Sequence, residues 1–218
     1  MLGFVPQPNL QELEISVVLC AFSVISVVKK EELNILRLDL YDNTNFDRGR
    51  PAWIEALWII LQAFFVRSWV PGTAHRKILL KIFGAKIGKG VNIKSGVQIK
   101  FPWRLEIGNH SWIGESVWID NIAPVTVGSH CCISQGVYLC TGSHDLTSER
   151  FDFIAEPIEI LDGAWLGAKT VVGPGVTVGK RAVLTLGSVA EKDLKAGCIY
   201  QGKPACITGM RDNEILSD

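Results

Sequence analysis

The chain has 218 residues, which is enough for one sizeable domain and an appendage. Its 22 Lys and Arg residues balance its 22 Asp and Glu residues, so the formal net charge is zero. A neutral chain lacks the basic field that neutralises phosphates, which argues against binding to nucleic acid. Six cysteines without a CxxC pair argue against a zinc or redox site and favour reduced thiols in the cytoplasm.

Residues 1–32 form an apolar extension whose role the sequence leaves undefined. Its most apolar run, residues 15–28, is shorter than the roughly 20 residues of a membrane-spanning helix. No basic residue precedes this run, as one would in a secretory signal peptide. We interpret it as a short apolar helix or a segment at a membrane surface.

Residues 33–86 are predicted to be partly irregular and partly helical. The polar stretch 39–50 is rich in turn formers, and Pro51 can open a helix over residues 52–69. A second helix is expected over residues 75–83. Four apolar residues recur at helical spacing and are expected to pack on the main domain rather than on a membrane: Trp58, Leu61, Phe65 and Trp69.

From Ile87 onward an aliphatic residue recurs every six positions, a period that fits neither an α-helix nor simple strand alternation. Such hexads are typical of a parallel β-helix, in which three hexads form a triangular coil and stacked coils share hydrogen bonds. The predicted fold is therefore all-β, a left-handed parallel β-helix over residues 87–206 with an N-terminal helical region and a C-terminal tail at 207–218. The recurring aliphatic residues are Ile87, Ile93, Ile99, Ile107, Ile113, Ile119, Val127, Ile133, Leu139, Ile160, Leu166, Val172, Val178 and Leu184.

The step from Leu139 to Ile160 is much longer than the others, and it predicts an excursion loop at about residues 142–156. His144 lies where the coil gives way to this loop. An imidazole can take a proton from a hydroxyl at cellular pH, so His144 is a candidate general base, although position alone leaves a structural role equally open. His110 and His130 fall beside coil corners and are expected to be surface polar residues.

The hexads, the segment 141–145 and the ending 202–205 (Gly-Lys-Pro-Ala) together resemble the hexapeptide-repeat acetyltransferases, the family of the maltose and galactoside O-acetyltransferases. The similarity runs from about residue 38 to residue 205. It is closest to the acetyltransferases of colanic-acid-type exopolysaccharide biosynthesis. The more specific markers are residues 46–51, 101–104, 118–121 and 134–136.

This resemblance implies an acetyltransferase that moves an acetyl group from acetyl-CoA to a sugar hydroxyl in exopolysaccharide biosynthesis. It implies a homotrimer with active sites between neighbouring prisms, in the cytoplasm or at the inner face of the membrane. His144 would deprotonate the acceptor hydroxyl for direct attack on the thioester, with no metal taking part. The implied partners are acetyl-CoA and a sugar or glycan acceptor; nucleic acid is excluded, and a membrane is not favoured.

The resemblance also implies which residues hold the substrates. The stretch that would line the CoA groove comprises Trp165, Gly167, Ala168, Leu186 and Gly187, with Lys192 and Lys203 as candidates for the phosphates. The family usually has an arginine after its Gly-x-Pro-Ala ending, but this chain has Cys206 there, and Arg211 follows later. Asp120 and Asn121 carry groups that suit sugar hydroxyls, although such residues also form coil corners.

Three other interpretations remain open. One is an acyltransferase for serine or an amino sugar, and another is a non-catalytic β-helix that serves in binding or assembly. The third is a carbonic anhydrase of the γ type, which needs three zinc-binding histidines. His110 and His130 are one coil apart, but the sequence offers no matching third ligand. His144 at the loop start favours an acyltransferase.

Overall fold

The computed structural model describes residues 36–44 and 46–211, so the apolar extension at residues 1–32 lies outside the described residues. The described residues fall into two compact units. The smaller unit comprises residues 36–41 and 146–151, and the larger contains the remaining described residues. Because the β-helix and every candidate site residue belong to the larger unit, the site can be described within it.

The smaller unit joins a short 3-10 turn, η1 (Leu38–Leu40), to the tip of the excursion loop. The backbone N–H of Arg37 donates to the carbonyl oxygen of Glu149 at 2.9 Å. The rings of Tyr41 and Phe151 meet edge to face with centroids 6.3 Å apart. The beginning of the described chain is thus paired with a segment more than a hundred residues later.

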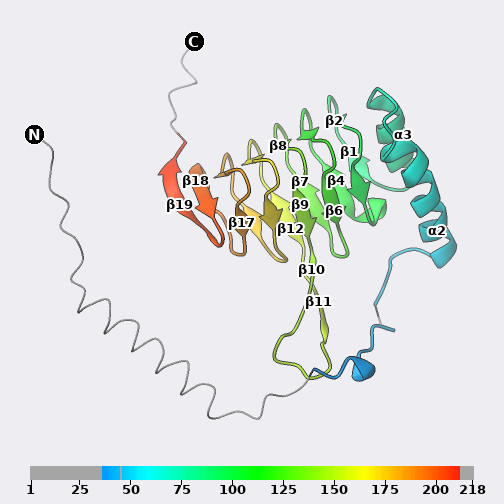
Figure 1. Cartoon of the computed structure of the whole chain (residues 1–218). Coiled ribbons are helices and arrows are strands. Elements are labelled where there is room, and N and C mark those ends of the chain that lie inside the picture. The colour runs from blue at the N-terminus through cyan, green and yellow to red at the C-terminus, as the bar shows by residue number, and fades with distance from the viewer. Residues whose placement is uncertain (1–35, 45, 212–218) are drawn as a thin grey trace, which may run out of the picture. The chain divides into compact units, whose positions relative to one another are not determined.

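The larger unit is a parallel β-helix whose strands stack into three sheets, A, B and C (Figure 1). Sheet A contains β1 (Lys86–Ile87), β4 (Leu105–Ile107), β7 (Val125–Val127), β12 (Ile158–Ile160) and β15 (Thr177–Val178). Sheet B contains β2 (Asn92–Ile93), β5 (Trp112–Ile113), β8 (Cys132–Ile133), β13 (Trp165–Leu166), β16 (Val183–Leu184), β18 (Cys198–Gly202) and β19 (Ala205–Met210). Sheet C contains β3 (Gln98–Ile99), β6 (Trp118–Asp120), β9 (Tyr138–Cys140), β14 (Val171–Val172) and β17 (Val189–Ala190). The predicted parallel β-helix is confirmed.

The core is the ladder of hexad side chains inside the prism. Every recurring aliphatic residue from Ile87 to Leu184 is buried, and stacked coils keep them in register, as in the pair Ile87 and Ile107. The small or β-branched residue four positions later is buried as well, where the wall turns a corner: Val91, Val97, Ser111, Val117, Ala123, Cys131, Val137, Ala164, Thr170, Val176, Ala182 and Ser188. Most hexads therefore bury one aliphatic side chain and one small or β-branched side chain inside the prism.

Helices α2 (Ala52–Leu61) and α3 (Ala74–Ile82), with the π-helical turn η2 (Gln62–Val66), cover the N-terminal end of the prism (Figure 1). Trp58 donates its indole N–H to the carbonyl oxygen of Ile99 at 2.8 Å. The amide oxygen of Gln62 accepts the N–H of Ile99 at 2.5 Å. These bonds satisfy backbone groups of the first coil that face away from the second coil, so the helices close the open edge of the stack.

The apolar stripe predicted for the first helix is only partly correct. Trp58 is fully buried against the prism, but Phe65 is half exposed and Trp69 is 78% exposed. Val66 is fully buried instead. The reason is the turn η2, because a π turn bonds residues five apart, rotates less per residue than an α-helix and so brings Val66 inward. Trp69 lies beyond the helical turns.

Arg76 fixes the connection between η2 and α3. Its guanidinium is buried and donates to the carbonyl oxygens of Val66 at 3.0 Å, Ser68 at 2.7 Å and Val70 at 2.8 Å, and also to that of Gly72. A cation at the end of a helix is favourable because the last carbonyls lack partners within the helix. One side chain therefore binds four carbonyl oxygens of this connection.

The stretch predicted as an excursion loop, residues 142–156, contains a β-hairpin. Strands β10 (Gly142–His144) and β11 (Phe153–Ala155) pair antiparallel and project from the wall after β9 (Figure 1). In the stretch predicted as a C-terminal tail from residue 207, β19 runs on to Met210, antiparallel to β18. Within the described part of the chain, no helix is both long and apolar enough to span a bilayer.

Candidate active site

Thr141 anchors the foot of the hairpin. Its side chain is fully buried, donates to the carbonyl oxygen of Asp120 at 2.8 Å and accepts the N–H of Ala123 at 2.9 Å. Its own carbonyl accepts the N–H of Glu156 at 2.9 Å, so both strands of the hairpin are tied to the preceding coil. The position of His144, three residues further on, follows from these bonds.

His144 ends β10 directly opposite Phe153 of β11. The imidazole is half-buried, and its ring meets that of Phe153 edge to face with centroids 5.6 Å apart. Phe153 in turn meets Phe46 at 5.5 Å. Aromatic pairs of this geometry hold rings in defined orientations. The imidazole is thus supported on one side while keeping contact with solvent.

The segment before the first helix contributes to this support, although the sequence indicated only an irregular stretch. Phe46 stacks on Phe101 with ring centroids 6.4 Å apart, and the guanidinium of Arg104 lies 5.4 Å from both rings. Arg104 ends the 3-10 turn η3 (Pro102–Arg104) and donates to the carbonyl oxygens of Ile122 and Asp47. Two markers of the family resemblance, 46–51 and 101–104, therefore pack against each other beside the hairpin.

A polar cluster lies on sheet C below the hairpin. The carboxylate of Asp120 is largely buried, lies 3.3 Å from the Lys100 ammonium and accepts the Tyr138 hydroxyl at 3.3 Å. The Tyr138 hydroxyl is also 3.2 Å from the Cys140 sulfur, and its ring stacks on Trp118 at 4.5 Å. Burial, reinforced by Cys140 and Asp120, raises the pKa of Tyr138 well above its usual value. The phenol therefore stays protonated and remains a hydrogen-bond donor.

Asn121 does not belong to this polar surface. It is fully buried, its amide NH₂ donates to the carbonyl oxygen of Phe101 at 2.6 Å, and its amide oxygen accepts the Phe101 N–H at 2.9 Å. Because both ends of the amide are used on a neighbouring coil, we correct its assignment from acceptor binding to structural support. Asp120 stays a candidate for acceptor binding.

The residues expected to line the CoA groove lie on sheet B and on the edge between sheets B and C, called here the B–C edge. Trp165 is 47% exposed on β13 and donates its indole N–H to Ser134 at 3.0 Å, beside a groove of about 340 Å³ on sheet B. The N–H of Gly187 donates to the carbonyl of Ala168 at 2.9 Å, stacking two coils at this edge. Leu186 is 72% exposed, and the space outside Gly187 is open.

His144 lies on a different edge of the prism, between sheets C and A, called here the C–A edge. The turn after β17 places exposed Lys192 on the same edge, two coils further along. Lys203 is exposed in the turn between β18 and β19. β18 runs parallel to β16, and the N–H of Gly202 donates to the Ser188 hydroxyl at 3.0 Å, so this turn lies at the B–C edge. Arg211, considered in place of the missing family arginine, donates instead to the carbonyl of Gly163 at 3.0 Å. The predicted residues therefore form two separate groups within one chain.

Comparison with known proteins decides the family. No family model matches the chain. A protein of Escherichia coli named as a colanic acid biosynthesis acetyltransferase, WcaF, is 41% identical over 162 residues, 73% of this chain and 88% of that protein. The chain belongs to the hexapeptide-repeat acetyltransferases.

Two further relatives agree with this assignment. The galactoside O-acetyltransferase of Escherichia coli is 26% identical over 135 residues, which is 61% of this chain and 66% of that protein. A hexapeptide-repeat acetyltransferase of Vibrio cholerae, solved in complex with acetyl coenzyme A, superposes with a TM-score of 0.68 at 26% identity, covering 74% of this chain and 89% of that chain. The protein is thus an acetyltransferase on a hexapeptide-repeat scaffold.

The histidine pair weighed for a zinc site lies away from the hairpin. The rings of His110 and His130 stack with centroids 5.3 Å apart at successive coil corners, as their spacing of one coil predicts. Over residues 36–44 and 46–211, no three His, Cys, Asp or Glu side chains are grouped so that they could hold a metal ion. Both histidines are exposed, so the stacked pair lies on the surface of the prism.

The sequence could indicate His144 but not its neighbours Phe46, Phe153 and Tyr138. Tyr138 stands one residue before a hexad aliphatic and carries no motif of its own. The signal that could have found it is the 20-residue stacking period, which sets Tyr138 beside Trp118 on the next coil. No comparable signal exists for Phe46, because its partners come from the hairpin and from η3.

Proposed function

We propose that this acetyltransferase transfers the acetyl group of acetyl-CoA to a sugar hydroxyl during exopolysaccharide synthesis in the cytoplasm, with His144 as the general base. The observation that carries the proposal is the half-buried imidazole of His144, held by Phe153 at the foot of a hairpin beside a polar cluster. The name of the Escherichia coli relative supports the pathway, and the acetyl-CoA complex of the Vibrio cholerae relative supports the donor.

The proposed reaction needs one proton acceptor and no covalent enzyme intermediate. The imidazole of His144 takes the proton of the acceptor hydroxyl while its oxygen forms a bond to the thioester carbonyl carbon. The carbon–sulfur bond breaks, and the leaving thiolate takes the proton from the imidazolium. The products are an acetyl ester and free CoA thiol, and His144 returns to its starting state.

The acceptor is proposed to bind over the cluster of Asp120, Tyr138 and Cys140. A carboxylate accepts hydrogen bonds from sugar hydroxyls, and the protonated Tyr138 phenol can donate one. The stacked rings of Trp118 and Tyr138 extend this surface along sheet C. An acceptor held here would reach His144 from below the hairpin, since Cys140 is only four residues before it.

The donor site is proposed to form between two copies of the chain. His144 lies on the C–A edge, whereas Trp165, Gly167, Ala168, Leu186 and Gly187 lie on sheet B and the B–C edge. A ring of three prisms would bring the C–A edge of one copy to the B–C edge of the next, because heterologous contacts related by a threefold rotation close into a ring. We therefore propose a homotrimer with three equivalent sites.

A thiol-release assay with acetyl-CoA and a panel of acceptors tests this proposal. The panel contains neutral sugars, amino sugars and serine, and mass spectrometry of the product distinguishes an ester from an amide. The proposal expects release that depends on a neutral sugar and gives an ester. Amide products would support an amino acceptor instead, and CoA binding by calorimetry without thiol release on any acceptor would indicate a binding module.

A further inference from the structure

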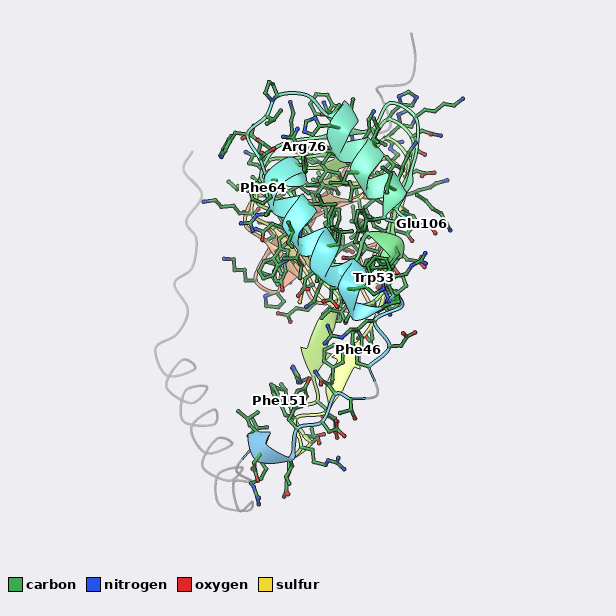
Figure 2. The ribbon with its side chains drawn as sticks, turned by 90° about the vertical axis from the view of Figure 1, so that its right-hand side faces the viewer. Phe46, Trp53, Phe64, Arg76, Glu106 and Phe151 are labelled. Atoms are coloured by element: carbon green, nitrogen blue, oxygen red, sulfur yellow. The ribbon has the colours of Figure 1, made fainter. Side chains whose placement is uncertain are left out.

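The two helices at the end of the prism present an apolar surface outward. α2 uses Trp58 to face the prism, and its opposite side carries further large apolar residues. We call this surface the outer face and define it by Trp53, Leu57, Ile60, Phe64, Ile78 and Ile82, whose side chains expose between 42% and 72% of their area. Figure 2 looks directly onto it, with Trp53 and Phe64 labelled along α2 and η2, and Arg76 between the two helices.

Such a surface is unusual for a helix in contact with water. A helix that is apolar on both sides is normally covered on both sides, and contiguous apolar patches on proteins mark interaction sites. Between α2 and α3 the outer face is hollowed into a groove of about 250 Å³. Its lining is apolar apart from one arginine: Arg50, Trp53, Ile54, Leu57, Ile82 and Phe83.

The charges around the outer face are mainly basic. Residues 51–83 contain a single acidic residue, Glu55, and its carboxylate pairs with Arg48 at 2.8 Å. Exposed Arg67 and Lys81 and half-buried Lys77 form a basic rim. This excess of positive charge is local, because the chain as a whole is neutral.

We propose that the outer face docks on the surface of an anionic lipid bilayer. Helices that lie in the membrane interface combine Trp, Phe and Leu on one side with Lys and Arg beside them, and the headgroups of anionic lipids attract the basic residues. The outer face provides both parts. Side chains such as Trp53 and Phe64 enter the headgroup region, while the basic rim pairs with lipid phosphates.

Two other occupants fit the charges less well. A second copy docked face to face would bring Lys77, Lys81 and Arg67 of both copies together, which is unfavourable. The apolar segment 15–28 of the same chain contains no charged residue, so it would cover the apolar centre and leave the basic rim unpaired. An anionic bilayer accounts for the centre and the rim together.

Vesicle flotation with the full chain tests the apolar part of this proposal. The protein is expected to float with phosphatidylcholine vesicles that contain about a third phosphatidylglycerol, and to bind less as salt is raised. The double variant Ile60→Ser/Phe64→Ser should weaken binding more than about tenfold, because two apolar side chains no longer enter the interface. The matched control is Ile207→Ser/Met210→Ser, which changes two exposed apolar residues on β19 and should bind as the wild type does.

A charge variant tests the rim without touching the apolar surface. Lys77→Gln/Lys81→Gln should bind several-fold less to vesicles with phosphatidylglycerol and be unchanged on pure phosphatidylcholine, since only anionic headgroups attract the rim. Lys180→Gln/Lys195→Gln, on exposed turns of the later coils, is the control and should change neither. Thermal unfolding of every variant should match the wild type, because the substituted side chains are exposed or at the rim.

Three results would overturn the proposal. The first is a wild-type chain that does not float with anionic vesicles at low salt. The second is flotation that neither double variant reduces, which would assign the binding to another part of the chain such as residues 15–28. The third is a change of oligomeric state in Ile60→Ser/Phe64→Ser, seen by sedimentation, with unchanged flotation; this would assign the outer face to contact between copies.

Discussion

His144 owes its position to two separate parts of the structure. Thr141 ties the hairpin foot to the coil below through three hydrogen bonds. Phe153, on the opposite strand, supports the ring from the side. A base that moves a proton must be held within hydrogen-bond reach of the acceptor, and a side chain fixed from below and beside meets that need.

Replacement of His144 tests its chemical role. His144→Ala is expected to lower turnover by about 10²–10⁴-fold, the usual contribution of a positioned proton acceptor. The affinity for CoA, measured by calorimetry, should change little because the proposed groove lies on sheet B and the B–C edge. His130→Ala is the matched control, since it removes an imidazole from another corner of the same coil, and it should keep wild-type turnover. Near-normal turnover of His144→Ala would remove this residue from the mechanism.

The raised pKa of Tyr138 predicts a dependence of stability on pH. An unfolded tyrosine loses its proton at a pH of about 10, while the folded Tyr138 keeps its proton to higher pH. Below pH 10 both states hold the proton, so the stability difference between wild type and Tyr138→Phe should be constant. Above about pH 10 the unfolded wild type is stabilised by ionisation, and the wild type should lose stability relative to the variant.

Urea unfolding of both proteins between pH 8 and pH 11 measures this difference. The free energy of unfolding of the variant is subtracted from that of the wild type at each pH. This removes the contributions of other groups that titrate over the same range. Plotted against pH, this difference in free energy is expected to be flat at first. It should fall as the pH passes the pKa of an unfolded tyrosine, about 10. A difference that stays flat to the highest pH would mean that the surroundings of Tyr138 do not favour its neutral form.

The sequence indicates individual candidate residues better than it indicates the groups that their side chains contact. His144 could be found because it stands at a break in a strict period. Asn121 was assigned to substrate because its side chain suits hydroxyls, yet the stacked coil uses that same amide to bind the backbone of Phe101. Residue type alone cannot distinguish these uses, since both rest on the same hydrogen-bonding groups.

Among the elements, the helical pair replaces the coil that is missing at the start of the stack. A parallel stack leaves unpaired backbone groups at each end, and exposed strand edges invite pairing with other chains. Here Trp58 and Gln62 bind the backbone of Ile99, and the hydroxyl of Thr73 accepts the N–H of Ile93 at 2.8 Å. The helices thus act as the cap that repeat structures need.

Removal of one capping group should destabilise the protein without affecting the active site. Gln62→Ala leaves the N–H of Ile99 without its acceptor, which is expected to cost about 1–3 kcal/mol. The midpoint of thermal unfolding should fall by a few degrees, whereas Gln201→Ala, at an exposed position on β18, should leave it unchanged. Turnover per folded molecule should be the same in all three proteins. An unchanged midpoint for Gln62→Ala would show that the cap does not depend on this bond.

The elements also show why helix boundaries and faces are hard to predict. The sequence indicates one helix over residues 52–69, but the chain forms an α-helix to Leu61 and then the π turn η2. The change of rotation leaves Phe65 half exposed instead of packed on the prism. Nothing in the local composition indicates a π turn, because it is imposed by the fit of Gln62 and Val66 to the first coil.

For the molecule as a whole, the repeat makes the β-helix predictable and leaves assembly open. Each coil contacts only its neighbours, so a fixed period in the sequence becomes a fixed rise in space. The hexads from Ile87 to Leu184 therefore predict the aliphatic ladder inside the prism, but not the core residues that the helices add, such as Trp58 and Leu80. The hexads carry no information on which edge of the prism meets another copy. The edges that meet decide whether His144 and the proposed CoA groove form one site.

Mixing two inactive variants tests whether the site is shared between copies. His144→Ala lacks the base on the C–A edge, and Leu186→Glu places a negative charge in the proposed CoA groove on the B–C edge, where it would repel the anionic cofactor. Each variant alone should be inactive or nearly so. In trimers formed by unfolding and refolding an equal mixture, an intact His144 meets an intact B–C edge at about one site in four, so about a quarter of wild-type turnover should return. A site contained in one chain predicts no recovery of turnover, because each chain would still carry its own defect. A protein that sediments only as a monomer at micromolar concentration would contradict the trimer directly.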